Sequence, residues 1–303
     1  MKYQLLGKNI GNKLNIKIAV LSFLTKNLLI KSISITSALL LLSQLPVNAQ
    51  NILKEIENTG ILKVGIADNA IPFGYRDDNQ ELRGICLEFV KLIQKNLTVI
   101  LNRQSITTQV YVSNLKNRFQ LVNDGVVYLE CGANTIREIE GYNVTFSDPF
   151  FITGLQFLTK KNQVNNINST NNNLRLGALN NTTTADYLSQ QFSQANLRLF
   201  DGANGAKQGG RALENNRIDA FASDGILLVG IALSLNLPLN GEYEIVPKIP
   251  LTCEKYGVIL PANDPLWNDF INQIIMSVEP ENIMGAWLNF AEDSVKESPD
   301  CSL

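Results

Sequence analysis

The chain has 303 residues, 45% of them hydrophobic, and its 26 basic and 28 acidic side chains nearly balance. It contains no histidine, which excludes the Ser-His and Cys-His nucleophile arrangements and removes a frequent metal ligand.

The first 49 residues are typical of a secretory signal peptide. They hold six lysines and no acid, then an apolar run over Ser37–Leu45, and we expect cleavage after Ala49. Because Ile18–Leu24 is also apolar, an uncleaved anchor is the alternative. Cleavage would leave 254 residues (303 − 49), enough for two modest domains, with 20 bases (26 − 6) against 28 acids. Because of the signal peptide, we expect the mature chain in the periplasm. Its net charge of about −8 (20 − 28) predicts that it does not bind nucleic acid.

All four cysteines follow this segment, at Cys86, Cys131, Cys253 and Cys301. An even number in an oxidising compartment predicts two disulfides, and three pairings are open. The spacing is not that of a zinc site, and we expect no metal and no cofactor.

In chain order, the first half begins with an apolar strand over Ile61–Ala67 that ends at Asp68. A helix is expected over Ile85–Leu97, where apolar residues recur at helical spacing. The stretch Phe119–Gly132 then predicts the end of a helix, a turn at Gly125 and a strand.

The second half repeats this plan. Leu174–Leu179 predicts a strand, Thr182–Thr184 predicts the cap of a helix, and Arg211–Gly225 again predicts a helix end, a turn and a strand. Strands that alternate with helices indicate an α/β fold with mostly parallel sheets flanked by helices. The Asn-rich stretch Lys160–Asn173 between the halves is expected to be a solvated loop.

Polar segments follow several of these strands at their carboxyl ends, where parallel α/β sheets bind ligands. These segments are Asp68, Gly132–Arg137, Asn181–Thr183 and Asp224. Arg137 is the clearest candidate, because a guanidinium matches a carboxylate with two parallel hydrogen bonds. A surface arginine without a ligand is the alternative.

Five short motifs occur along the chain. They are Val64-Gly65 with Pro72-Phe73, Glu130-Cys131-Gly132 with Thr135 and Arg137, Phe146-Ser147-Asp148-Pro149-Phe150, Asp219-Ala220-Phe221 with Asp224, and Tyr256-Gly257. In their order and spacing they resemble the family 3 extracellular solute-binding proteins, the polar amino-acid receptors of ABC importers, which are related to the ligand cores of glutamate receptors. The Glu-Cys-Gly motif resembles the glutamate/aspartate branch in particular.

The resemblance implies a periplasmic-binding-protein type II fold, with two lobes joined by crossings near Phe157–Lys161 and Ile245–Ile249. Residues 50–157 and 249–303 would form lobe 1, and residues 158–248 would form lobe 2. It also implies a monomer that captures an amino acid in the cleft without catalysis, closes about its hinge and is recognised by an ABC-transporter permease.

The family pattern also implies roles for particular residues. Arg137 would bind the ligand's α-carboxylate, with Asn134, Thr135 and the backbone of Gly132 beside it. Asp224 would accept from the α-ammonium, because a buried zwitterion needs an opposite charge at each end. For Asp224 a simple turn residue is the alternative.

A second-lobe helix would contribute further donors from Asn181, Thr182 and Thr183, where the helix dipole favours an anion. Helix capping without ligand contact is the alternative for the two threonines. Asp68 is assigned to a basic ligand side chain or to the α-ammonium, with a turn acid as the alternative.

The chain departs from the glutamate/aspartate branch at the positions that would bind the ligand side chain. It has Ala67 where that branch has a basic residue, and Ala70 where many relatives have an aromatic residue. The turn between Gly132 and Arg137 is also shorter. We therefore expect a polar neutral or basic amino acid rather than an acidic one.

The glutamate-receptor comparison also implies a pairing of the cysteines. It joins Cys253 to Cys301 and leaves Cys86 with Cys131. The latter bond would fix the strand end that precedes Arg137, and each bond would contribute roughly 2–4 kcal/mol.

Two other classes of protein remain open. A fold-related periplasmic enzyme, such as a dehydratase, would need a general acid over its substrate, and Glu130 and Asp148 are the available carboxylates. A sensory binding module would carry a transmembrane helix and an effector domain after the binding core.

Overall fold

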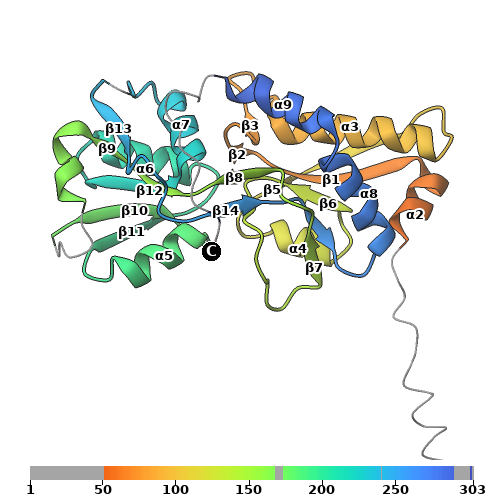
Figure 1. The fold of residues 1–303 in the computed structure, drawn as a ribbon, viewed down its shortest axis with the longest axis horizontal. Helices are drawn as coiled ribbons and strands as arrows, with labels where there is room; N and C mark the ends of the chain where they lie inside the picture. Colours follow the sequence, from red (N-terminus) through yellow and green to blue (C-terminus); the bar gives the residue numbers. More distant parts are fainter. Residues whose placement is uncertain (1–50, 168–172, 240, 290–300, 302–303) are drawn as a thin grey trace, which may run out of the picture. The chain divides into compact units, whose positions relative to one another are not determined.

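The computed structural model describes residues 51–167, 173–239, 241–289 and 301 (Figure 1). The signal peptide expected over residues 1–49 lies outside the described residues, so its cleavage stays a prediction. Within the described ranges, no helix combines the length and the apolar character needed to cross a membrane.

The first sheet has five strands, in the order β5-β1-β6-β15-β7. Strand β1 runs parallel to β5 and β6, whereas β15 runs antiparallel to β6 and β7. The strands are β1 (Ile61–Ala67), β5 (Thr107–Ser113), β6 (Leu129–Cys131), β7 (Val144–Phe146) and β15 (Ile259–Pro261). The helices beside this sheet are α2 (Ile52–Thr59), α3 (Ile85–Ile100), α4 (Arg118–Asn123), α8 (Pro265–Ile275) and α9 (Val278–Leu288).

The second sheet also has five strands, in the order β11-β10-β12-β9-β13. Strand β10 is parallel to β11 and β12, whereas β9 is antiparallel to β12 and β13. The strands are β9 (Leu155–Lys160), β10 (Arg175–Leu179), β11 (Asn196–Phe200), β12 (Ala220–Asp224) and β13 (Tyr243–Val246), and the helices are α5 (Thr183–Gln191), α6 (Gly205–Glu214) and α7 (Gly225–Ser234).

The predicted internal repeat is confirmed by the strand orders. In each sheet the first strand of a β-α-β-α-β unit lies between the second and the third, as β5-β1-β6 and as β11-β10-β12. The three repeated strands are parallel, as predicted, and the antiparallel strands that make both sheets mixed come from the segments that pass between the two sheets and back. The repeat therefore places the carboxyl ends of β1, β6, β10 and β12 at equivalent positions.

Smaller elements surround this framework. Strands β2 (Asn69–Ala70), β3 (Gly74–Arg76) and β4 (Leu82–Arg83) form a three-stranded sheet, and β8 (Phe151–Thr153) pairs with β14 (Glu254–Tyr256). The start of the predicted Asn-rich loop forms a 3-10 helix over Lys161–Asn166, and residues 168–172 lie outside the described residues.

The two connections between the sheets run side by side. The first crossing was expected near Phe157–Lys161, but β9 is already paired in the second sheet from Leu155, so the chain crosses at Gly154. The amide of Leu251 donates to the carbonyl of Leu155 at 2.9 Å. A Cβ at Gly154 would overlap the carbonyl oxygen of Thr252, so this close approach needs glycine.

Most predicted elements are confirmed. Helix α3 buries Cys86, Phe89, Val90, Ile93 and Leu97 and extends three residues beyond the predicted end. Helix α5 begins where the threonine cap predicted it.

Both implied disulfides are present. Cys86 is bonded to Cys131, with a Cα–Cα distance of 5.6 Å, and Cys253 is bonded to Cys301, with a Cα–Cα distance of 5.4 Å. The first bond joins the start of α3 to the last residue of β6. It therefore fixes the strand end from which the Gly132–Arg137 segment leaves.

Candidate functional site

A cavity of about 530 Å³ lies between the carboxyl ends of the two sheets. Its volume is in the range of pockets for small molecules. It is lined by the loops after β1, β5 and β6 and by the first turns of α5, α6 and α7. This is the edge that the sequence predicted, because the strands of both repeats end there.

Seven of the nine predicted site residues line this cavity, namely Asp68, Asn134, Thr135, Arg137, Thr182, Thr183 and Asp224. Gly132 and Asn181 are not among the lining residues. Gly132 is buried behind the wall, close to Ala67, and Asn181 is exposed at the turn before α5, where it adopts a φ of 60°. The roles assigned to all nine stay predictions.

Arg137 lies at the edge of the cavity and keeps 36% of its side chain exposed. Its Nη1 atom is 3.7 Å from Oδ2 of Asp186, which belongs to the first turn of α5. The preceding residue is held in place because the amide of Ile136 donates to the carbonyl of Lys255 at 2.8 Å. The backbone next to Arg137 is therefore held in place, and the guanidinium has one weak ion pair, with the exposed Asp186.

Arg118 is a second cavity arginine, which the sequence reasoning missed. It is 8% exposed, and its Nη1 atom donates to Oδ1 of Asn134 at 2.9 Å, whereas its Nε has no partner among the described residues. Burial lowers the pKa of Arg118, the charge of Glu130 raises it and the charge of Arg137 lowers it again. The two guanidinium groups therefore act on each other in one cavity. An arginine at the start of a short helix gives no periodic signal of burial.

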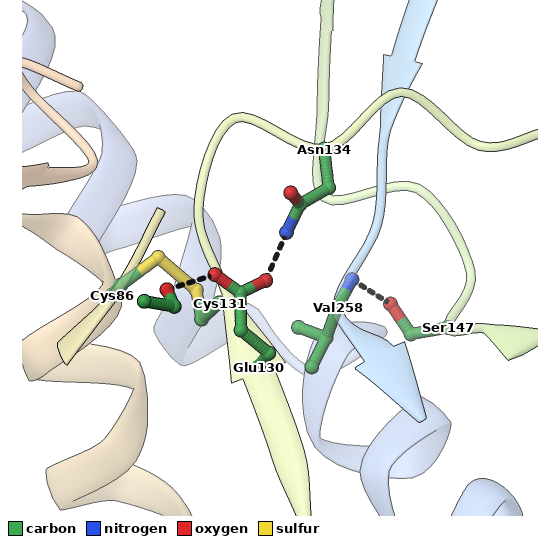
Figure 2. The surroundings of a disulfide bond; sticks show 7 residues. Cys86, Glu130, Cys131, Asn134, Ser147 and Val258 are labelled. Carbon is green, nitrogen blue, oxygen red and sulfur yellow. Dashed lines mark hydrogen bonds between the residues drawn. A yellow bond between two sulfur atoms is a disulfide. The ribbon is translucent and has the colours of Figure 1, made fainter. Parts of the chain in front are cut away.

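Glu130 belongs to a hydrogen-bonded group that includes Asn134, next to the Cys86–Cys131 disulfide (Figure 2). Its Oε1 accepts from the hydroxyl of Ser113 at 2.5 Å, and its Oε2 accepts from Nδ2 of Asn134 at 2.6 Å. Complete burial raises the pKa of Glu130, and the bond from Ser113, the charge of Arg118 and the bond from Asn134 oppose this shift. Hydrogen bonds thus connect Ser113, Glu130, Asn134 and Arg118 in series.

Asp224 ends β12 and precedes α7 on the opposite side of the cavity. It occupies the N-cap position, but its side chain makes no cap bond. Oδ2 instead accepts from the hydroxyl of Tyr256, and the buried Oδ1 has no partner among the described residues. Burial and then the charge of Glu254 raise the pKa of Asp224 to about 7, although the bond from Tyr256 opposes the shift.

The hydroxyls of Thr182 and Thr183, at the start of α5, have different hydrogen-bond partners. Thr182 caps α5, because its Oγ1 accepts from the amide of Ala185 at 3.2 Å. Thr183 donates from its Oγ1 to Oε2 of Glu254 at 3.3 Å. Capping, the alternative for these residues, is therefore present at Thr182.

Asp68 already has a basic partner. Its Oδ2 accepts from Nε of Arg76 at 3.2 Å, and Arg76 also donates to the carbonyl of Gln80. In this ion pair the side chain of Asp68 is 15% exposed and that of Arg76 is 39% exposed.

Among the described residues, no group of acids and cysteines has the arrangement of a metal site.

Two α/β lobes with a charged cavity at their facing sheet ends define the architecture of a two-lobe binding protein. The chain matches the model of the bacterial extracellular solute-binding proteins, family 3, over residues 62–289, and it belongs to this family. The match extends from the second residue of β1 to the end of α9.

A similar protein is the glutamate/aspartate import solute-binding protein of Escherichia coli (strain K12). It is 28% identical over 250 residues, which cover 79% of this chain and 80% of that protein. Another relative is the glutamine-binding protein of Geobacillus stearothermophilus, at 24% identity over 60% of this chain and 68% of that protein.

Among solved structures, the ancestral amino acid-binding protein AncCDT-1, a precursor of cyclohexadienyl dehydratase, has a TM-score of 0.67 to this chain. It is 19% identical, and the match covers 78% of this chain and 99% of that one. At this identity the likeness shows the fold alone. It confirms the predicted type of fold.

Proposed function

We propose that this protein binds an acidic amino acid in the cavity between its lobes and delivers it to an ABC-transporter permease. The observation that carries the proposal is the set of three charges in one cavity, the guanidiniums of Arg118 and Arg137 and the carboxyl of Asp224. An acidic amino acid carries the complementary set, two carboxylates and one ammonium. Each charged hydrogen bond contributes about 1.5–3 kcal/mol.

Of the other charged groups of the cavity wall, Lys207 and Asp78 carry opposite charges, and Glu130 accepts from Ser113 and Asn134. Asp68 is paired with Arg76, and Asp77 with Arg83. A neutral amino acid would match one guanidinium and Asp224, and it would leave the second guanidinium without a carboxylate of the ligand, which is less favourable in a partly buried cavity. A basic amino acid would place its cation in a cavity whose lining already holds Arg76, Arg118, Arg137 and Lys207.

This proposal replaces the preference for a neutral or basic ligand. That preference rested on Ala67, the position where the related branch has a basic residue, and it did not include Arg118. The relatives do not support a preference over acidic ligands, since the Escherichia coli protein is named for glutamate and aspartate import, although the Geobacillus stearothermophilus protein is named for glutamine binding. Arg118 supplies a positive charge from another element of the same wall.

The lobe boundaries and hinge closure belong to the same proposal. A ligand that contacts both walls stabilises the state in which they are close, and the permease would recognise that state. Contacts between the walls support this, because Arg137 lies near Asp186 and Lys116 is 3.6 Å from Asp201. The proposal includes export to the periplasm as a monomer, and the predicted signal peptide supports the export.

A fold-related enzyme is the second candidate, because Asp224 is a buried carboxyl with a pKa of about 7 in the cavity. Such a group can exchange a proton with a bound molecule near neutral pH. Binding without turnover favours the receptor, and conversion of the ligand favours the enzyme.

The test is calorimetry of the mature protein with glutamate, aspartate, glutamine, asparagine and arginine, followed by analysis of the recovered ligand. We expect glutamate or aspartate to bind at least tenfold more tightly than its amide, with no conversion. Arg137→Ala should reduce this affinity at least a hundredfold. The proposal would be wrong if none of the five bound, and the site assignment would be wrong if Arg137→Ala bound like the wild type.

A further inference from the structure

The orientation of Arg118 rests on a single polar neighbour. Among the described residues, Arg118 has no acid within ion-pair distance, and its side chain makes one hydrogen bond, from Nη1 to Oδ1 of Asn134. The guanidinium carbon also lies 4.8 Å from the ring centre of Phe119, which restricts one face of the group. The end of the Asn134 amide that faces Arg118 therefore sets the direction in which the other N–H groups of the guanidinium point.

The two ends of an asparagine amide have nearly the same shape but opposite hydrogen-bonding character. At Asn134 the nitrogen end donates to Oε2 of Glu130 at 2.6 Å, as Figure 2 shows. Both carboxyl oxygens of Glu130 accept hydrogen bonds, from Ser113 and from the nitrogen end of Asn134, so the oxygen end of Asn134 is left for Arg118. By holding the nitrogen end of Asn134, Glu130 leaves Oδ1 of Asn134 as the acceptor for Arg118.

Glu130 and Asn134 are themselves held from several sides. The hydroxyl of Ser113 occupies Oε1 of Glu130, and a Cβ at Gly65 would lie 2.9 Å from Cγ of Glu130. The carbonyl of Asn134 accepts from the amide of Gly257 at 3.0 Å. Neither residue can shift far to accommodate a change in the other.

We propose that Glu130 is a positioning residue for ligand binding, which fixes the polarity of Asn134 and through it directs the guanidinium of Arg118 toward a ligand carboxylate. It does not touch the ligand. The inference rests on the proposed function, because it needs a carboxylate of the ligand at Arg118.

The test is a double-mutant cycle with Glu130→Gln and Arg118→Met, read out as the dissociation constant for glutamate. Gln has the shape of Glu but can donate from one end, so Asn134 is no longer held in one polarity. We expect Glu130→Gln to weaken glutamate binding about tenfold in the wild-type background and less than twofold in the Arg118→Met background. A purely structural role would give the same loss in both backgrounds, and that result, or no loss in either, would overturn the inference.

The matched control is Asp219→Asn, the same acid-to-amide change at a carboxylate that holds another arginine. Asp219 accepts from Nη2 of Arg175 at 2.5 Å in the second sheet, outside the cavity lining. We expect it to leave glutamate affinity unchanged. Where the Glu130→Gln protein does not fold, Glu130→Met, which removes the acceptor for the nitrogen of Asn134 without touching the ligand, carries the same expectation in the same two backgrounds.

The experiment separates this inference from the proposed function. If the wild type binds no amino acid of the panel, both are wrong. If the wild type binds glutamate and Arg118→Met weakens it, but the cycle is additive, the proposed function stands and only the role of Glu130 is wrong.

Discussion

The two walls of the cavity present charge in different ways. On the wall beside the first sheet, Arg118, Asn134, Glu130 and Ser113 hold one another through a series of buried side-chain hydrogen bonds. On the wall beside the second sheet, Asp224 and the threonines stand at the first turns of helices, and each has a separate partner. The bonds of the first wall are present without a ligand, whereas in the proposed closure the helix ends of the second wall would approach it.

This difference predicts that the two walls fail differently when altered. A change in the first wall should disturb several residues at once, because each orients the next. A change in the second wall should remove one contact.

Arg118→Met should produce the largest loss. It removes a buried charge from the first wall, so we expect at least a hundredfold weaker binding of glutamate and a loss of less than tenfold for glutamine, measured by calorimetry. The control is Arg198→Met on β11, where the guanidinium lies over Phe200 and outside the cavity lining. Equal losses for both ligands would show that Arg118 does not bind the side-chain carboxylate.

Asp224 should make binding depend on pH. In the free protein its pKa is about 7, so below that pH it holds a proton that the ligand's ammonium must displace. We expect glutamate affinity to fall about tenfold or more from pH 7.5 to pH 5.5, with proton release at pH 6 seen by calorimetry in two buffers. Asp224→Asn should bind weakly at both pH values and release no proton. Proton uptake on binding would contradict this role.

The two disulfides can be compared because they close loops of similar length, while one of them adjoins the first wall. Their cysteines are 45 and 48 residues apart, so removing either should lower the free energy of unfolding by a similar amount, about 2–4 kcal/mol. Only Cys86–Cys131 holds the end of β6, next to Glu130 (Figure 2). We expect its double alanine variant to bind glutamate about threefold more weakly, and the Cys253/Cys301 variant to bind normally once folded. Equal affinities in both variants would show that β6 needs no such support.

The smallest effect is expected at the ion pair between the walls. Lys116 and Asp201 are 3.6 Å apart and both side chains are largely exposed, so solvent screens their attraction. Lys116→Gln should change glutamate affinity less than twofold, and added salt should reduce even that difference. A larger loss would mean that this contact contributes to closure.

The elements of the fold followed from local signals. Alternating strand and helix patterns located β1, β10, α3 and α5, since the apolar residues that form each core face are close together in the sequence. The position of the first crossing could not be read in this way. The apolar strand β9 gives no sign of the sheet it joins, and its pairing with β12 and β13 decided that the chain crosses at Gly154.

For the site, too, local sequence patterns predicted some features and not others. Local sequence patterns predicted which polar segments meet, because strands of a repeated parallel plan end at one edge, and they indicated Arg137, Asp224 and the four cysteines as candidates. The burial of Arg118 in the same cavity as Arg137 and the raised pKa of Asp224 became visible in the folded chain alone. Burial and the charges nearby depend on residues far apart in the chain, so no local pattern encodes them.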